Sequence, residues 1–154
     1  MRTAALILLL TPSNWAGTAF GTWIVNPARS TSARSPRAKS ITIRFEPHAK
    51  GEVFTMDRIE ADGRSLTSST LLYLDGKARD FLDAGCSGTQ SSRRMDGQTV
   101  EILRWCANGD TIRFVRRLSA QPNELILDIT EHRAGGRTFE RHMVLEKQSV
   151  TEGQ

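Results

Sequence analysis

The sequence is poor in cysteine, in histidine and in long apolar runs, and each shortage excludes a class of protein. Two cysteines in 154 residues are too few for a disulfide-rich scaffold. No run of 18 or more apolar residues occurs, which excludes a membrane-spanning helix. The apolar fraction of 38% and the charged fraction of 25% are ordinary for a globular chain, so disorder of the whole chain is excluded as well. The length predicts a single domain.

The first residues have the layout of a secretory signal peptide. Met1 and Arg2 give a positive start, residues 4–10 are all apolar, and small and polar residues follow. The other interpretations are a short buried strand or helix, or a wrongly assigned start codon. We therefore predict a signal peptide over residues 1–19 and export to the periplasm or beyond.

The cleavage position follows from the small residues that close this segment. Gly17 and Ala19 occupy the third and first positions before a cut at Phe20, where small residues are required. A cut after Ala16 is the alternative, although Asn14 fits the third position less well. We predict a mature domain over residues 20–148 and a frayed tail over residues 149–154.

The predicted export bears on the state of the two cysteines. Cys86 and Cys106 lie 20 residues apart, and an exported chain meets an oxidising environment. We predict a disulfide between them. The alternative is two separate buried thiols. A zinc site is not expected, because neither cysteine has a second cysteine or a histidine at metal-ligand spacing.

The rest of the chain predicts about ten β-strands, separated by turn signals every 8–12 residues. Asp75-Gly76, Asp96-Gly97 and Asn108-Gly109 are tight-turn signals, Pro47 is expected to end its strand, and residues 26–40 are expected to form a long loop. This spacing predicts an all-β fold, an antiparallel up-and-down β-barrel of about eight to ten strands. The predicted strands are residues 21–25, 41–46, 52–60, 65–74, 77–81, 90–95, 99–105, 111–118, 124–132 and 137–147.

Alternation of side chains assigns one face of each predicted strand to a common core. The opposite face is charged, as in a sheet with one dry and one wet face. The predicted core positions are Ile41, Ile43, Phe45, Val100, Ile102, Ile112, Phe114, Leu118, Leu125, Leu127, Ile129, Phe139, Met143 and Leu145. The predicted outer positions are Arg44, Glu46, Glu101, Arg113, Arg117, Glu140 and Glu146.

Several short motifs resemble a family of small exported bacterial β-barrel proteins. Gly21-Thr22-Trp23 precedes the segment 26–30, and that family opens with a Gly-Thr-Trp strand, then Asn, a basic residue and Ser. The turn 75–77 and the ending 144–148 resemble the same family. The resemblance covers about residues 21–148 and implies a fold and a compartment more than an activity.

Gly-x-Trp on a first strand also resembles the lipocalins and their barrel relatives. In those proteins the tryptophan closes the barrel floor and packs against a basic side chain from a late strand. The lipocalin-like resemblance therefore implies that Trp23 packs against Arg141 or Arg116.

A barrel of this size has room for interior side chains or for one small ligand. Large apolar side chains are the candidates for contacting a ligand, and the alternative is that they simply fill the core. The predicted ligand-binding residues are Trp23, Phe45, Tyr73, Trp105, Phe114 and Met143.

Other chemistry finds little support in the sequence. No histidine has metal-ligand spacing, no nucleophile motif occurs, and we expect no metal, no cofactor and no enzymatic activity. If the Gly135-Gly136 turn sets the register, His142 is expected across from Asp128 or a near neighbour. A His–Asp pair there could orient an imidazole for acid–base work, but a surface cross-strand pair is the expectation. The basic pairs and the basic loop lack interleaved aromatics, so we expect no nucleic-acid binding. Two hypotheses remain: an exported protein that binds a small apolar or amphipathic ligand, and a cell-envelope structural or interaction module without a cavity.

Overall fold

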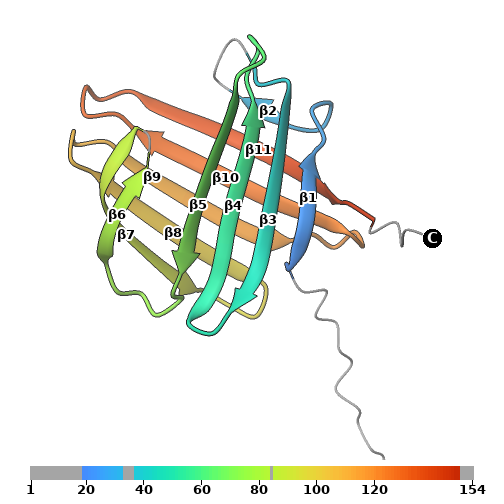
Figure 1. The fold of residues 1–154 in the computed structure, drawn as a ribbon, viewed down its shortest axis with the longest axis horizontal. Helices are drawn as coiled ribbons and strands as arrows, with labels where there is room; N and C mark the ends of the chain where they lie inside the picture. Colours follow the sequence, from blue (N-terminus) through green and yellow to red (C-terminus); the bar gives the residue numbers. More distant parts are fainter. Residues whose placement is uncertain (1–18, 33–36, 84, 150–154) are drawn as a thin grey trace, which may run out of the picture.

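The chain forms a nearly closed antiparallel β-barrel, as predicted (Figure 1). The computed structural model describes residues 19–32, 37–83 and 85–149. Ten strands follow one another around the wall in the order β5-β4-β3-β1-β11-β10-β9-β8-β7-β6, and the short β2 pairs with β11. The strands are β1 (Gly21–Val25), β2 (Thr31–Ser32), β3 (Ser40–His48), β4 (Gly51–Ile59), β5 (Ser65–Leu72), β6 (Arg79–Asp83), β7 (Cys86–Arg94), β8 (Thr99–Cys106), β9 (Thr111–Leu118), β10 (Glu124–His132) and β11 (Thr138–Lys147).

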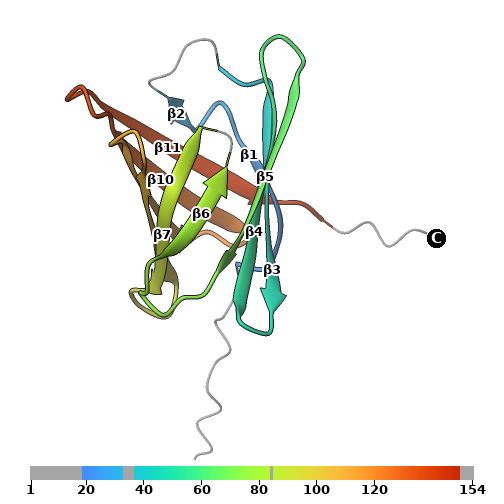
Figure 2. The same cartoon turned by 60° about the vertical axis from the view of Figure 1, so that its left-hand side comes forward.

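The first strand holds the two halves of the wall together. Trp23 on β1 pairs with Ile43 on β3 and with Lys147 on β11. Strands β3, β4 and β5 form one side of the barrel, and β6 to β11 form the other (Figure 2). Because β1 bridges them, residues near the two ends of the chain complete one wall.

The wall has one seam, between β5 and β6, which are the two ends of the sheet order. Side chains cross it in place of a backbone ladder between these two strands. The hydroxyl of Ser68 donates to Asp83 Oδ2 over 2.9 Å, and Gln90 Nε2 donates to Thr70 Oγ1 over 3.0 Å. The barrel is therefore closed at this point by side-chain hydrogen bonds.

Antiparallel pairing places alternate turns at the two ends of the barrel. The β3–β4 hairpin at residues 48–51 lies at one end, which we name the closed end. The β4–β5 turn at residues 60–64 and the β10–β11 turn at residues 133–137 lie at the other, which we name the open end. These names mark where the core and the cavity lie.

Aromatic and aliphatic side chains fill the barrel towards its closed end, because period-two alternation turns them inward. Phe45 and Phe54 stack with ring centroids 5.1 Å apart, and Phe54 meets Phe114 edge-on at 6.1 Å. The buried core comprises Trp23, Ile43, Phe45, Phe54, Leu72, Val100, Ile102, Phe114, Leu125, Leu127, Ile129, Met143 and Leu145.

Three local expectations were wrong. Pro47 does not end its strand but lies inside β3, where it pairs with Glu52 of β4. Proline has no backbone N–H to donate, but on its other side β3 pairs with β1 only as far as Phe45. The proline therefore interrupts no backbone ladder between β3 and β1. Strand β7 begins at Cys86 rather than at residue 90. The predicted loop over 26–40 contains β2, which pairs with Arg141 and His142 of β11. Residues 1–18 of the predicted signal peptide 1–19, and residues 150–154 of the predicted tail 149–154, lie outside the described residues.

Candidate functional site: a cavity at the open end

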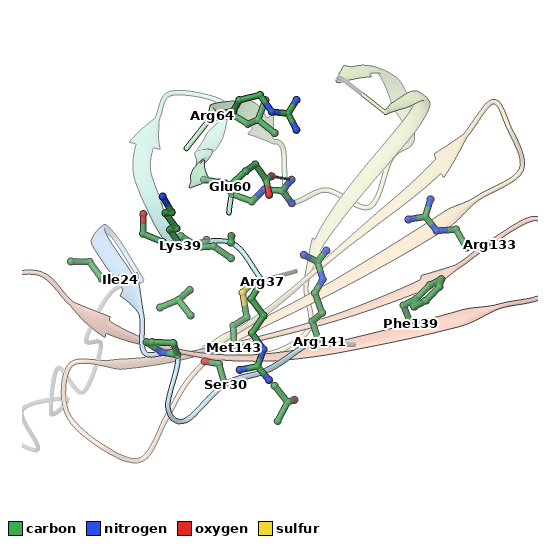
Figure 3. Close-up of a pocket in the computed structure, with 18 of the residues that line it drawn as sticks. Ile24, Ser30, Arg37, Lys39, Glu60, Arg64, Arg133, Phe139, Arg141 and Met143 are labelled. Atoms are coloured by element: carbon green, nitrogen blue, oxygen red, sulfur yellow. Dashed lines mark hydrogen bonds and ion pairs between the residues drawn. The ribbon is translucent and has the colours of Figure 1, made fainter. Parts of the chain in front are cut away.

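A cavity opens into the barrel from its open end. It has a mouth chamber of about 980 Å³ and an inner chamber of about 440 Å³. The two chambers share Arg58, Leu66, Arg133 and Arg141 in their walls, so they adjoin each other. Figure 3 shows the mouth chamber, with Lys39, Glu60 and Arg64 on one side and Arg133 and Phe139 on the other. These volumes are in the range that accommodates a small organic ligand.

Apolar side chains make up a large part of both chambers. Val25, Ile41 and Met143 lie in the mouth chamber, and Phe54 and Phe114 lie in the inner chamber beside the core. These residues continue the inward apolar positions of their strands towards the opening. An apolar group placed here would therefore leave water without disturbing the packing at the closed end.

A buried arginine projects into the inner chamber. Arg104 follows Ile102 in phase on β8, and the residue is only 7% exposed. Its guanidinium carbon lies 4.2 Å from the ring centroid of Phe81 and 4.8 Å from that of Phe114, and its Nε donates to Gln90 Oε1 over 2.8 Å. Its Nη1 is 3.9 Å from Asp83 Oδ2. Burial lowers the pKa of Arg104 to about 10, because desolvation outweighs the attraction of Asp83.

A cluster of charged side chains from β10, β11 and the turn between them lies at the rim of the inner chamber. Glu131 accepts from Arg141 over 2.8 Å and from Arg133 over 2.9 Å. Arg133 also donates to Asp110 over 2.9 Å. The N–H of Ala134, and then Arg133, hold the pKa of Asp110 below its ordinary value. This network fixes guanidinium groups at the rim of the cavity in defined positions.

The structure brings two of the predicted ligand-binding residues to the cavity. Phe114 lies in the wall of the inner chamber and Met143 in the wall of the mouth chamber. Trp23 and Phe45 are buried in the core at the closed end. Tyr73 borders a separate hollow of about 190 Å³ beside the seam, where the guanidinium of Arg79 lies 3.7 Å from its ring centroid.

Trp105 lies on the outer face of β8 and is 43% exposed. It stands one residue out of phase with Ile102 and Arg104, both of which point inward. The alternation of β8 therefore separates this ring from the cavity.

The implied partners of Trp23 need correction. Lys147 on β11 places its Nζ 5.6 Å from the indole centroid, because Trp23 and Lys147 are directly paired. Arg116 instead lies over Phe45 at 4.3 Å, and Arg141 binds Glu131. The basic side chain against the tryptophan thus does come from the last strand, but it is neither of the two arginines.

Two pairings predicted from sequence are confirmed. Cys86 and Cys106 form a disulfide between β7 and β8 at the open end. His142 and Asp128 are opposite each other on β11 and β10, with Nδ1 and Oδ1 2.5 Å apart. Within the described residues no cluster of histidine, cysteine and carboxylate side chains could hold a metal ion.

The polar interior was not predicted from the sequence. Arg58, Arg104, Glu131 and Arg141 stand two residues from Met56, Ile102, Ile129 and Met143, and therefore face the same way as these apolar residues. That phase was the available signal. A charged residue at an inward position near the end of a strand predicts a polar chamber rather than a completely filled core.

Comparison with known proteins gives a likeness of fold. No family model matches the sequence, and no curated protein matches it. The solved structure of the zebrafish ileal bile acid-binding protein complexed with cholic acid resembles this chain with a TM-score of 0.52 and 14% identity, covering 84% of this chain and 98% of that one. The likeness is one of fold, an antiparallel β-barrel. The described part of the chain has no helix that could cross a membrane.

Proposed function

We propose that this chain is an exported binding protein that holds a small amphipathic molecule inside its barrel. The observation that carries the proposal is the pair of adjoining chambers, whose walls combine apolar side chains with fixed guanidinium groups. Binding sites for amphipathic molecules need both kinds of surface, an apolar one for affinity and a few placed polar groups for orientation. The structural neighbour, described as a bile acid-binding protein with cholic acid, is consistent with this use of the fold.

Export is the second part of the proposal. The disulfide between Cys86 and Cys106 supports an oxidising compartment, and residues 1–19 have the layout of a signal peptide. The indole Nε1 of Trp23 donates to the carbonyl oxygen of Ala19 over 2.8 Å. A cut before Phe20 removes this acceptor from the mature chain, whereas a cut after Ala16 keeps it. N-terminal sequencing of the exported protein distinguishes the two cuts.

Native mass spectrometry of the purified protein tests the binding function. We expect a small molecule bound to the natural chain and none bound to Met56→Trp, since the indole would occupy the inner chamber that Met56 borders. Trp105→Ala, on the outer face, is the matched control and should keep the ligand. A natural chain that carries nothing, and whose melting temperature no amphiphile raises, would contradict the proposal.

The second candidate is an envelope interaction module. Its support is the segment 26–32, which extends beside β11 through β2 and borders the mouth chamber. Deleting residues 29–37 would then abolish capture of a partner while the barrel stays folded. If the deletion instead removes only the small molecule, the module hypothesis fails.

A further inference from the structure

Positive charge is concentrated at the mouth of the cavity. Among the described residues, seven basic side chains and only one acidic side chain, Glu60, line the mouth chamber. This excess of six exceeds the net charge of +4 of the whole chain, so the rest of the molecule is net negative. The basic side chains are Arg37, Lys39, Arg58, Arg64, Arg133, Arg137 and Arg141.

Ion pairs neutralise only part of this charge. Arg58 binds Glu60 over 2.6 Å and Arg64 binds Asp62 over 2.7 Å, while Arg133 and Arg141 share the carboxylates described above. Arg37, Lys39 and Arg137 have no ion pair with another described residue. All three lie at the entrance of the chamber, where they raise the electrostatic potential.

The inner chamber differs in this respect. It has four basic residues, Arg58, Arg104, Arg133 and Arg141, against three acidic ones, Asp83, Asp110 and Glu131, and these groups pair with one another or with neighbours. The surplus of positive charge therefore lies at the mouth, above the apolar walls. A ligand that follows this gradient has its anionic group outermost and its apolar part innermost.

We propose that the ligand is an amphiphile with a doubly charged anionic head group, such as a phosphate monoester, which Arg37, Lys39 and Arg137 hold at the mouth while its apolar chain enters the inner chamber. This inference rests on the proposed function and names the class of ligand for the same site. A phosphate monoester has a charge of about −1.5 to −2 near neutral pH and three acceptor oxygens. A carboxylate has a single charge and would leave most of the surplus unbalanced. Guanidinium groups also bind phosphate oxygens in pairs, which suits an arginine-rich mouth.

Isothermal titration calorimetry with four probes, each below its micelle concentration, tests this inference. At about pH 8, where a phosphate monoester is doubly charged, we expect decyl phosphate to bind at least about tenfold more tightly than decanoate, and both more tightly than decyltrimethylammonium. Inorganic phosphate, the fourth probe, should bind far more weakly than decyl phosphate, because it lacks the apolar chain. As the pH falls through about 6, where the phosphate gains a proton, the affinity for decyl phosphate should fall while that for decanoate stays nearly constant.

Paired variants separate local charge from total charge. Arg37→Ala with Arg137→Ala should weaken decyl phosphate about tenfold and leave neutral decanol unchanged. Lys50→Ala with Lys77→Ala removes the same charge from exposed positions at the closed end and should change neither affinity. Equal affinities for decyl phosphate and decanoate, or equal effects of the two double variants, would each overturn the inference and leave the binding function intact. Inorganic phosphate binding as tightly as decyl phosphate would overturn the inference and also contradict the role of the apolar walls in the proposed function. If none of the amphiphiles binds, the proposed function itself fails.

Discussion

The two ends of the barrel use the same strands and the same alternation, but they treat charge in opposite ways. At the closed end Glu52 pairs with Arg116 inside the core over 2.6 Å, and it also binds the more exposed Arg94 over 3.4 Å; Glu52 and Arg116 are both almost wholly buried. At the open end several charged groups share partners and border a cavity. The comparison teaches that an inward charge is enclosed with its counter-charge where the core surrounds it, and faces open space where the strands border the cavity.

The largest effect should come from breaking the closed-end pair. Glu52→Gln leaves the Arg116 guanidinium buried without its counter-charge, so we expect a loss of about 3–5 kcal/mol in the free energy of unfolding, measured by urea denaturation. Glu60→Gln, which breaks the half-exposed pair with Arg58 at the open end, is the matched control and should cost less than about 1 kcal/mol. Equal losses of unfolding free energy in the two variants would mean that burial of the ion pair at the closed end does not make it more important for stability than the pair at the open end.

A smaller effect of opposite sign is expected from the buried arginine of the inner chamber. The pKa of Arg104 is lower in the fold than that of a solvent-exposed arginine, so folding disfavours the charged form of its guanidinium. Arg104→Met should therefore raise the free energy of unfolding by about 1–2 kcal/mol. Arg104→Lys keeps the charge and should not stabilise. A clear loss of stability in Arg104→Met would show that the contacts with Gln90 and Asp83 outweigh desolvation.

The smallest effect concerns acid at the rim of the open end. The pKa of Asp110 is lowered in the fold, so its contribution is complete above the unfolded pKa, which is about 4, and is lost as the pH falls through the folded value. The difference in unfolding free energy between the natural chain and Asp110→Asn should be constant above about pH 5 and shrink below about pH 4. A difference that stays constant down to about pH 2 would assign the effect to packing rather than charge.

Most of the wall could be predicted from sequence, because each strand carries its own alternation and its own turn signal. The run from Ile41 to Phe45 and the turn Asn108-Gly109 are local patterns that need no other part of the chain. Pro47 was misjudged because its tolerance depends on where β1 stops pairing with β3, which is a property of two distant segments.

The cavity was less predictable, because its residues meet only through the register of many strands. Phase alone turns Arg58, Arg104 and Arg141 inward, but the sequence does not say whether such positions lie at a filled end or at an open one. Trp105 is the opposite case: its residue type suggested an interior position, but its phase on β8 places its side chain on the outer face, where it is exposed. The position along the barrel, together with phase, decides the role of each side chain.

The seam between β5 and β6 gives the barrel a mechanical property. Parting these two strands breaks the side-chain hydrogen bonds Ser68–Asp83 and Gln90–Thr70 and leaves every backbone ladder of the wall in place. The circumference of the barrel can therefore increase at the β5–β6 seam without the loss of a backbone hydrogen bond between paired strands. For the proposed binding function, this seam is the line along which the wall would open to admit ligands of different size.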